Sequence, residues 1–184
     1  MAELLAVPVT VGVVVALLVA LTLVPFVALH PRADEGAGRR VLRWSVVTGY
    51  VAAVAAATLV PLPAPGAQEC PSGGGWLQLV PLAFLSRVGA TGAAGEVLLQ
   101  VGLNVALFVP LGVLLRHWWG LTPAAVAGVA ALASLGIELT QLTGVWFLYD
   151  CAHRVADVDD VLANTLGGVL GALLSGTRPP AGRT

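Results

Sequence analysis

The chain has 184 residues, of which 58% are hydrophobic and 10% are charged, whereas soluble domains usually carry about a quarter charged residues. This composition excludes an ordinary soluble domain and predicts an all-α membrane protein, a polytopic helix bundle that forms one domain over residues 1–184. The net charge of −1 argues against nucleic acid as a partner. All nine basic residues are arginine, and Ala, Val, Gly and Leu dominate, which is typical of a high-GC bacterium.

Five apolar runs predict membrane-spanning helices, because about 17 to 25 apolar residues are needed to cross the hydrocarbon core. For the first run a secretory signal peptide is the alternative. However, no basic residue precedes this run, and it is longer than an h-region of about 7 to 15 residues. In the fourth run, Thr122 is an expected N-cap and Pro123 an expected first helical residue. The expected spans are residues 4–29, 41–60, 96–116, 123–143 and 158–174.

The arginines predict the orientation, because basic residues are retained in cytoplasmic loops. Seven of them would lie on one side of the membrane and two on the other. We therefore expect the N-terminus outside and the C-terminus in the cytoplasm, with the protein in the bacterial cytoplasmic membrane. The larger group is Arg32, Arg39, Arg40, Arg43, Arg116, Arg178 and Arg183, and the smaller group is Arg87 and Arg154.

The two expected outer loops carry the only cysteines of the chain, Cys70 and Cys151. An oxidising compartment permits a disulfide bond between them, and two free thiols are the alternative. The first of these loops also contains an apolar stretch, residues 76–85, that is short and interrupted by Pro81. It cannot span, so we expect it at the outer interface or dipping back into the bundle.

Polar side chains within the spans are costly and usually face the bundle interior or water. With the predicted orientation, those of the last three spans all fall in the outer half of the membrane or at its outer surface. Such residues predict a polar pocket that opens outward. Its expected members are Asn104, Glu138, Gln141, Arg154, Asp157, Asp160 and Asn164. The two asparagines have a plain alternative as interhelical hydrogen-bonding residues, and Glu138 as an interfacial residue. One of Asp157 and Asp160 could instead be a helix N-cap, and Arg154 a charge partner of Asp157.

The last span carries one helical stripe, because its polar and small residues follow steps of three and four. The stripe consists of Asp157, Asp160, Asn164, Gly168 and Gly171. Gly167 and Gly171 also form a G-x-x-x-G pair, which allows another helix to approach closely. The stripe is therefore expected to face the bundle. Asp159 falls off it, so we expect a solvated residue that interacts with the helix dipole.

The order of these motifs resembles the VanZ-like membrane proteins. Asn104 is followed by FVPLG at residues 108–112, then by Ser134-x-x-x-Glu138-x-x-Gln141 and by R-x-x-D-x-D-D-x-x-x-N-T-x-G from Arg154 to Gly167. QLVPL at residues 78–82 is similar to the family's N-x-x-P segment, with Gln in place of Asn. The similar region is about residues 76–175. The resemblance implies a link to resistance against the glycopeptide teicoplanin, with which the founding member is associated.

The leading hypothesis is a non-enzymatic envelope protein without a cofactor. Its outward pocket would engage a lipid-linked cell-wall precursor or an amphipathic antibiotic at the outer leaflet. The sequence has no G-x-S-x-G, no H-E-x-x-H and no histidines with ligand spacing. An enzyme is the alternative, in which Asp157, Asp160 and Glu138 hold Mg²⁺, or one carboxyl acts as acid or base on a polyprenyl phosphate or a lipid head group held by Arg154. A transporter with Glu138 as proton carrier is a third possibility.

Overall fold

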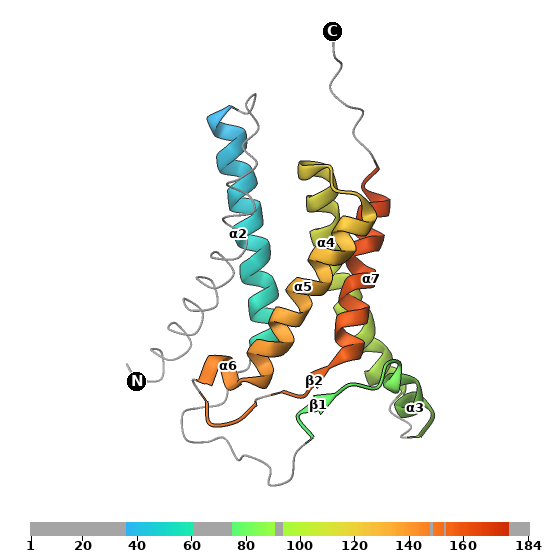
Figure 1. The fold of residues 1–184 in the computed structure, drawn as a ribbon. Helices are drawn as coiled ribbons and strands as arrows, with labels where there is room; N and C mark the ends of the chain where they lie inside the picture. Colours follow the sequence, from blue (N-terminus) through green and yellow to red (C-terminus); the bar gives the residue numbers. More distant parts are fainter. Residues whose placement is uncertain (1–35, 61–74, 91–93, 148, 153, 177–184) are drawn as a thin grey trace. The chain divides into compact units, whose positions relative to one another are not determined.

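The computed structural model describes residues 36–60, 75–90, 94–147, 149–152 and 154–176 (Figure 1). These residues are mostly helical, as expected, and the first expected span, residues 4–29, lies outside them. The helices are α2 (Ala37–Leu59), α3 (Ala83–Ala90), α4 (Ala94–Trp119), α5 (Pro123–Leu142), α6 (Gly144–Phe147) and α7 (Val158–Leu174), and the strands are β1 (Leu77–Gln78) and β2 (Ala156–Asp157).

Three described helices, α2, α4 and α5, are long and apolar enough to cross a membrane. They coincide with the second, third and fourth expected spans. In α5, the side chain of Thr122 accepts a hydrogen bond from the backbone N–H of Ala125 at 3.2 Å, and Pro123 is the first helical residue, as expected. Helix α7 begins and ends where the fifth span was expected. At 1.5 Å per residue its 17 residues rise only about 26 Å, less than the hydrocarbon thickness of about 30 Å, so its crossing remains a prediction.

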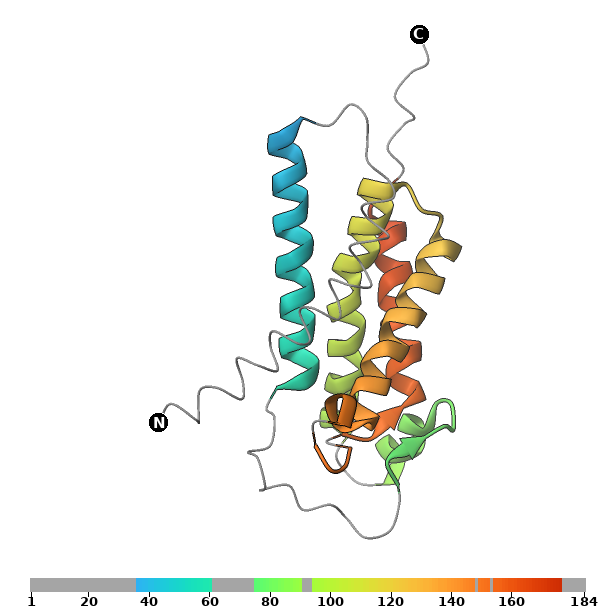
Figure 2. The same ribbon diagram turned by 60° about the vertical axis from the view of Figure 1, so that its left-hand side comes forward.

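The chain divides into two compact units, residues 1–62 and 63–184. The first contains α2, which extends four residues further toward the N-terminus than the expected span. The second contains all the other elements. In it α4, α5 and α7 lie side by side, α5 runs opposite to the other two, and α7 packs against both (Figures 1 and 2).

Glycines allow α7 to lie directly on the backbone of α4. A Cβ atom on Gly167 or Gly171 would overlap the carbonyl oxygens of Val105 and Val109 of α4, and one on Gly112 of α4 would overlap the carbonyl oxygen of Gly168. A Cβ atom on Gly168 would also lie 2.8 Å from the Cβ of Ala130 in α5. The stripe of small residues therefore faces the seam where α4 and α5 meet.

The short elements α3, β1, β2 and α6 gather at one end of this unit (Figures 1 and 2). Strand β1 pairs in parallel with β2, and the backbone N–H of Ala156 donates to the carbonyl of Trp76 at 2.8 Å. The first turn of α4, the last turn of α5 and the first turn of α7 lie at the same end. This end therefore collects the polar residues that the sequence places in three different helices.

Candidate functional site

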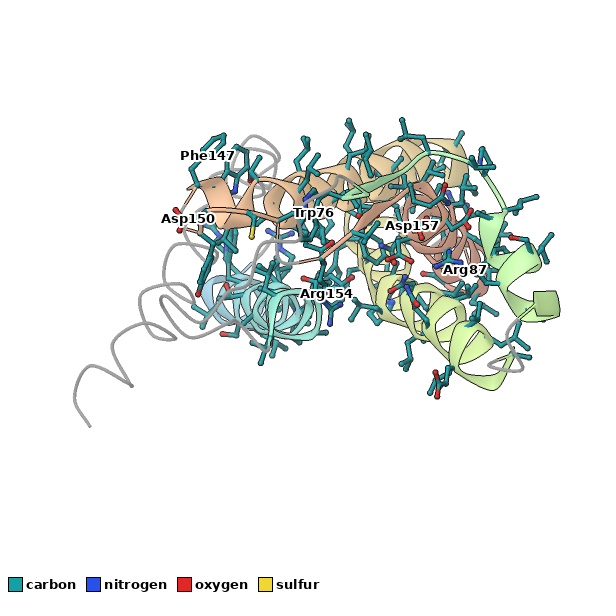
Figure 3. The ribbon with its side chains drawn as sticks, turned by 90° about the horizontal axis from the view of Figure 1, so that it is seen from below. Trp76, Arg87, Phe147, Asp150, Arg154 and Asp157 are labelled. Carbon is teal, nitrogen blue, oxygen red and sulfur yellow. The ribbon has the colours of Figure 1, made fainter. Side chains whose placement is uncertain are left out.

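Asp157 lies at the centre of the polar end, where β2 leads into α7. Its extended backbone makes it the N-cap of α7, and its Oδ1 accepts from the backbone N–H of Asp159 at 2.9 Å and from the side chain of Gln78 at 3.2 Å. Its Oδ2 accepts from Nη2 of Arg87 at 2.9 Å, an ion pair between α3 and the end of β2 (Figure 3). Both oxygens of this buried carboxylate are thus occupied.

Asp159 is not solvated, so the expectation for this residue was wrong. Its side chain is only 3% exposed, and it accepts hydrogen bonds from the backbone N–H groups of Leu82 and, at 2.9 Å, Phe84. Arg87 lies 3.7 Å from it. These two N–H groups precede or open α3, where a helix has no internal acceptors for them. The carboxylate therefore caps a second helix that is distant in sequence, which periodicity along α7 alone does not reveal.

Glu138 joins α5 to the same group of residues. Its Oε2 accepts from the backbone N–H of Asp157 at 2.9 Å, and the side chain is buried. Gln141, one turn further along α5, is also buried. The structure thus brings Glu138 and Asp157 together, as expected, although the contact runs through the backbone of Asp157 and not through its carboxylate.

Asp160 differs from the other acids because it is only half-buried. Its Oδ1 accepts from the side chain of Asn104 and, at 3.5 Å, from that of Gln100, both on α4. Within the described part of the chain, no hydrogen bond to its Oδ2 is observed. Asp160 therefore keeps one carboxylate oxygen for a further partner.

One turn further into the bundle, Asn164 joins α7 to α5. Its side-chain N–H donates to the hydroxyl of Ser134 at 2.8 Å, and both residues are buried. The amide oxygen of Asn164 is buried and has no hydrogen-bond partner among the described residues. This geometry is that of an interhelical hydrogen bond, which was the plain alternative for Asn164.

Two of the expected pairings are absent. Arg154 is exposed, and the ion pair to Asp157 that was assigned to it is made by Arg87 instead. Among the residues that the structure describes, no three His, Cys, Asp or Glu side chains form a group that could hold a metal ion.

Cys151 forms a disulfide bond. Cys70, the only other cysteine of the sequence, lies outside the described residues. Their pairing stays a prediction.

Four residues of the site are not predicted by sequence patterns, namely Gln78, Arg87, Gln100 and Asp159. The surroundings of Arg87 in the sequence could have indicated its role. It is the only basic residue between Arg43 and Arg116, and it lies beside an apolar stretch. A charge in such surroundings needs a partner. Gln78 and Gln100 carry no comparable mark, because their contacts depend on how β1 and α4 pack.

The apolar helices, with a group of hydrogen-bonded carboxylates at one end, are those of a helical membrane protein. The family model described as VanZ/LLP1 matches residues 47–177, which is more than half of the chain. The chain therefore belongs to the VanZ/LLP1 family, and the resemblance seen in the motifs is confirmed. The match begins within α2, ahead of the motif-bearing region. No curated protein and no solved structure matches the chain.

Proposed function

We propose that this VanZ-type membrane protein is a binding protein of the bacterial cytoplasmic membrane. Five spans, with the N-terminus outside, would place the polar end of α4, α5 and α7 at the outer leaflet. There it would engage a lipid-linked cell-wall precursor or an amphipathic antibiotic, and so contribute to resistance against teicoplanin-type glycopeptides. The orientation rests on the arginine distribution, because seven of the nine arginines would then be cytoplasmic.

The observation that supports this proposal is the difference between Asp160 and the other acids. Asp157, Asp159 and Glu138 are buried and bind backbone N–H groups, so they hold the fold together. Asp160 is half-buried, and its neighbour Gln100 is exposed. A carboxylate beside two amide side chains offers acceptors and donors to the amide, hydroxyl or amine groups of a bound molecule. Asp160 is therefore the residue through which binding would occur.

The test compares Asp160→Asn with Asp150→Asn, which changes an exposed acid outside the group. Wild type, both variants and an empty vector are expressed at matched membrane levels in a sensitive host, and killing by lipid-tailed and untailed glycopeptides is measured. We expect Asp160→Asn to lose roughly tenfold in protection against the lipid-tailed compound, because a charge-assisted hydrogen bond contributes about 1.5 to 3 kcal/mol. Asp150→Asn should match wild type. Equal killing of wild type and empty vector would remove the resistance role.

A further inference from the structure

Residues 79–85 form an apolar turn after β1 together with the first three residues of α3, and they expose large aliphatic side chains. Four of the seven residues are of this kind, namely Leu79, Val80, Leu82 and Leu85, with exposed fractions of 66%, 67%, 53% and 57%. In water such a dense apolar surface would be an aggregation site. The turn therefore needs an apolar surrounding.

The backbone of the same turn is unusually well satisfied for so short a segment. The N–H of Val80 donates to the side chain of Gln78, that of Ala83 to the carbonyl of Val80 at 3.3 Å, and that of Leu85 to the carbonyl of Leu82 at 3.1 Å. The N–H groups of Leu82 and Phe84 donate to Asp159, and Pro81 has no N–H. Every backbone N–H from residue 80 to residue 85 thus has a partner.

An apolar surface over a backbone whose N–H groups are all hydrogen-bonded is what the hydrocarbon core of a membrane requires. Within a bilayer core no water is available, so irregular backbone is stable only where its polar groups are bonded to protein. A turn in water would not need all of them satisfied, because solvent could replace any missing partner. The buried carboxylate of Asp159 supplies two acceptors that the turn itself lacks. The last three residues of this segment begin α3, which packs on α4, one of the helices that can cross a membrane.

We infer that residues 79–85 are immersed in the acyl chains of one phospholipid leaflet, as a wedge that does not cross the membrane and is anchored by Asp159. Seven residues are too few to span. The apolar surface stops before Arg87, whose side chain is 42% exposed. The guanidinium of Arg87 is paired with Asp157. The inference does not depend on the proposed binding function, because it concerns contact with bulk lipid.

The test uses the full-length wild-type protein in nanodiscs of phosphatidylethanolamine and phosphatidylglycerol that contain a phospholipid with a diazirine in its acyl chain. After illumination, lipid adducts are mapped by mass spectrometry. We expect residues 79–85 to be labelled to within about threefold of residues 98–103 of α4, and roughly tenfold more than residues 149–152 of the loop before β2. Labelling of the turn at the level of residues 149–152 would overturn the inference.

Amide hydrogen exchange at Leu82 and Phe84 tests the anchoring role of Asp159, because the hydrogen bonds of these two amides to its carboxylate slow their exchange. In Asp159→Ala, exchange at these two amides should be roughly tenfold faster or more than in Asp150→Ala, because their acceptor is lost. If Asp159→Ala does not fold, Asp159→Asn retains one acceptor oxygen and should show a smaller acceleration. Unchanged exchange in the folded variants would contradict the anchoring role.

Discussion

Asp157 joins four segments of the chain through one residue. Its carboxylate binds the side chain of Gln78 in β1, that of Arg87 in α3 and a backbone N–H of α7, while its own backbone N–H binds Glu138 in α5. In an apolar bundle a carboxylate is stable only when its lone pairs are used in this way. The acid therefore fixes the relative positions of the segments at the polar end.

Removal of the Arg87 charge should leave Asp157 without its charge partner. Because Arg87 is partly exposed, solvent would screen the loss, and we expect Arg87→Gln to lower the free energy of unfolding by about 1 to 2 kcal/mol. Arg87→Gln/Asp157→Asn should lose less than the sum of the two single variants, since neither charge is then left unpaired. Arg154→Gln is the control and should change stability by less than about 0.5 kcal/mol. Unfolding in mixed micelles measures these values, and equal losses from Arg87→Gln and Arg154→Gln would contradict the pairing.

Gly144 begins a left-handed turn that forms α6. Its φ is +59°, and residues 145–147 also have φ values between 56° and 66°. A Cβ atom at Gly144 would lie 2.5 Å from the carbonyl oxygen of Cys151 and 2.7 Å from that of Tyr149. The position therefore demands both the backbone conformation and the small size of glycine.

Gly144→Ala should loosen the loop between α5 and β2. A left-handed conformation costs an L-residue about 1 to 2 kcal/mol, and the overlap with two carbonyls adds to this cost. Limited proteolysis should cut residues 144–152 faster in this variant than in wild type. Gly136→Ala is the matched control, because Gly136 lies within α5 and a Cβ atom there meets nothing within 4 Å. Equal cleavage of the two variants would show that the left-handed turn does not constrain the loop.

At the scale of elements, the contact of α7 with α4 depends on glycine. Gly171→Ala places a methyl group against the backbone of Val109, which cannot turn aside as a side chain can. We expect a loss of about 1 to 3 kcal/mol in the free energy of unfolding, as in overpacked cores. Gly102→Ala, where a Cβ atom meets nothing within 4 Å, should be neutral or stabilising. Comparable losses in both variants would mean that helix propensity, and not the close contact, governs stability.

The helices themselves could be predicted because length and hydropathy determine them locally. The expected spans at residues 96–116 and 123–143 lie on α4 and α5, and the expected span at residues 158–174 is α7. The glycine spacing of α7 also indicated the face that meets another helix, since a period near 3.6 residues depends only on helix geometry. These features need no knowledge of distant residues.

The partners of the acids could not be predicted, because they depend on contacts between residues far apart in the chain. Asp159 was expected in water on the basis of its position around α7, yet it binds residues 82 and 84, which precede it by more than seventy positions. For the same reason, local spacing predicts Arg154 as the partner of Asp157, whereas the structure pairs Asp157 with Arg87. Local spacing identifies which residues are unusual, whereas tertiary packing decides which of them stabilise the fold.

At the scale of the whole molecule, the second unit is strongly asymmetric along its helices. One end holds the buried acids, α3, the two strands and the disulfide-bonded Cys151, whereas the opposite end is formed by the α4 to α5 connection, where Arg116 lies. Basic residues are retained in the cytoplasm, and disulfides form in oxidising compartments. Both features therefore predict the same orientation, with the acid-rich end outside.

This orientation can be tested with reporter fusions to the protein expressed in a Gram-negative host. Green fluorescent protein fused after Thr184 should fluoresce and alkaline phosphatase at the same position should be inactive, because the first reporter folds in the cytoplasm and the second needs the periplasm. Alkaline phosphatase fused after Ala90, downstream of two expected spans, should instead be active. As a control, a fusion after Leu121, in the connection between α4 and α5, should behave like the one after Thr184. Active phosphatase after Thr184 and inactive phosphatase after Ala90 would show that the protein has the opposite orientation in the membrane. The acids would then face the cytoplasm, and they could not meet an external antibiotic.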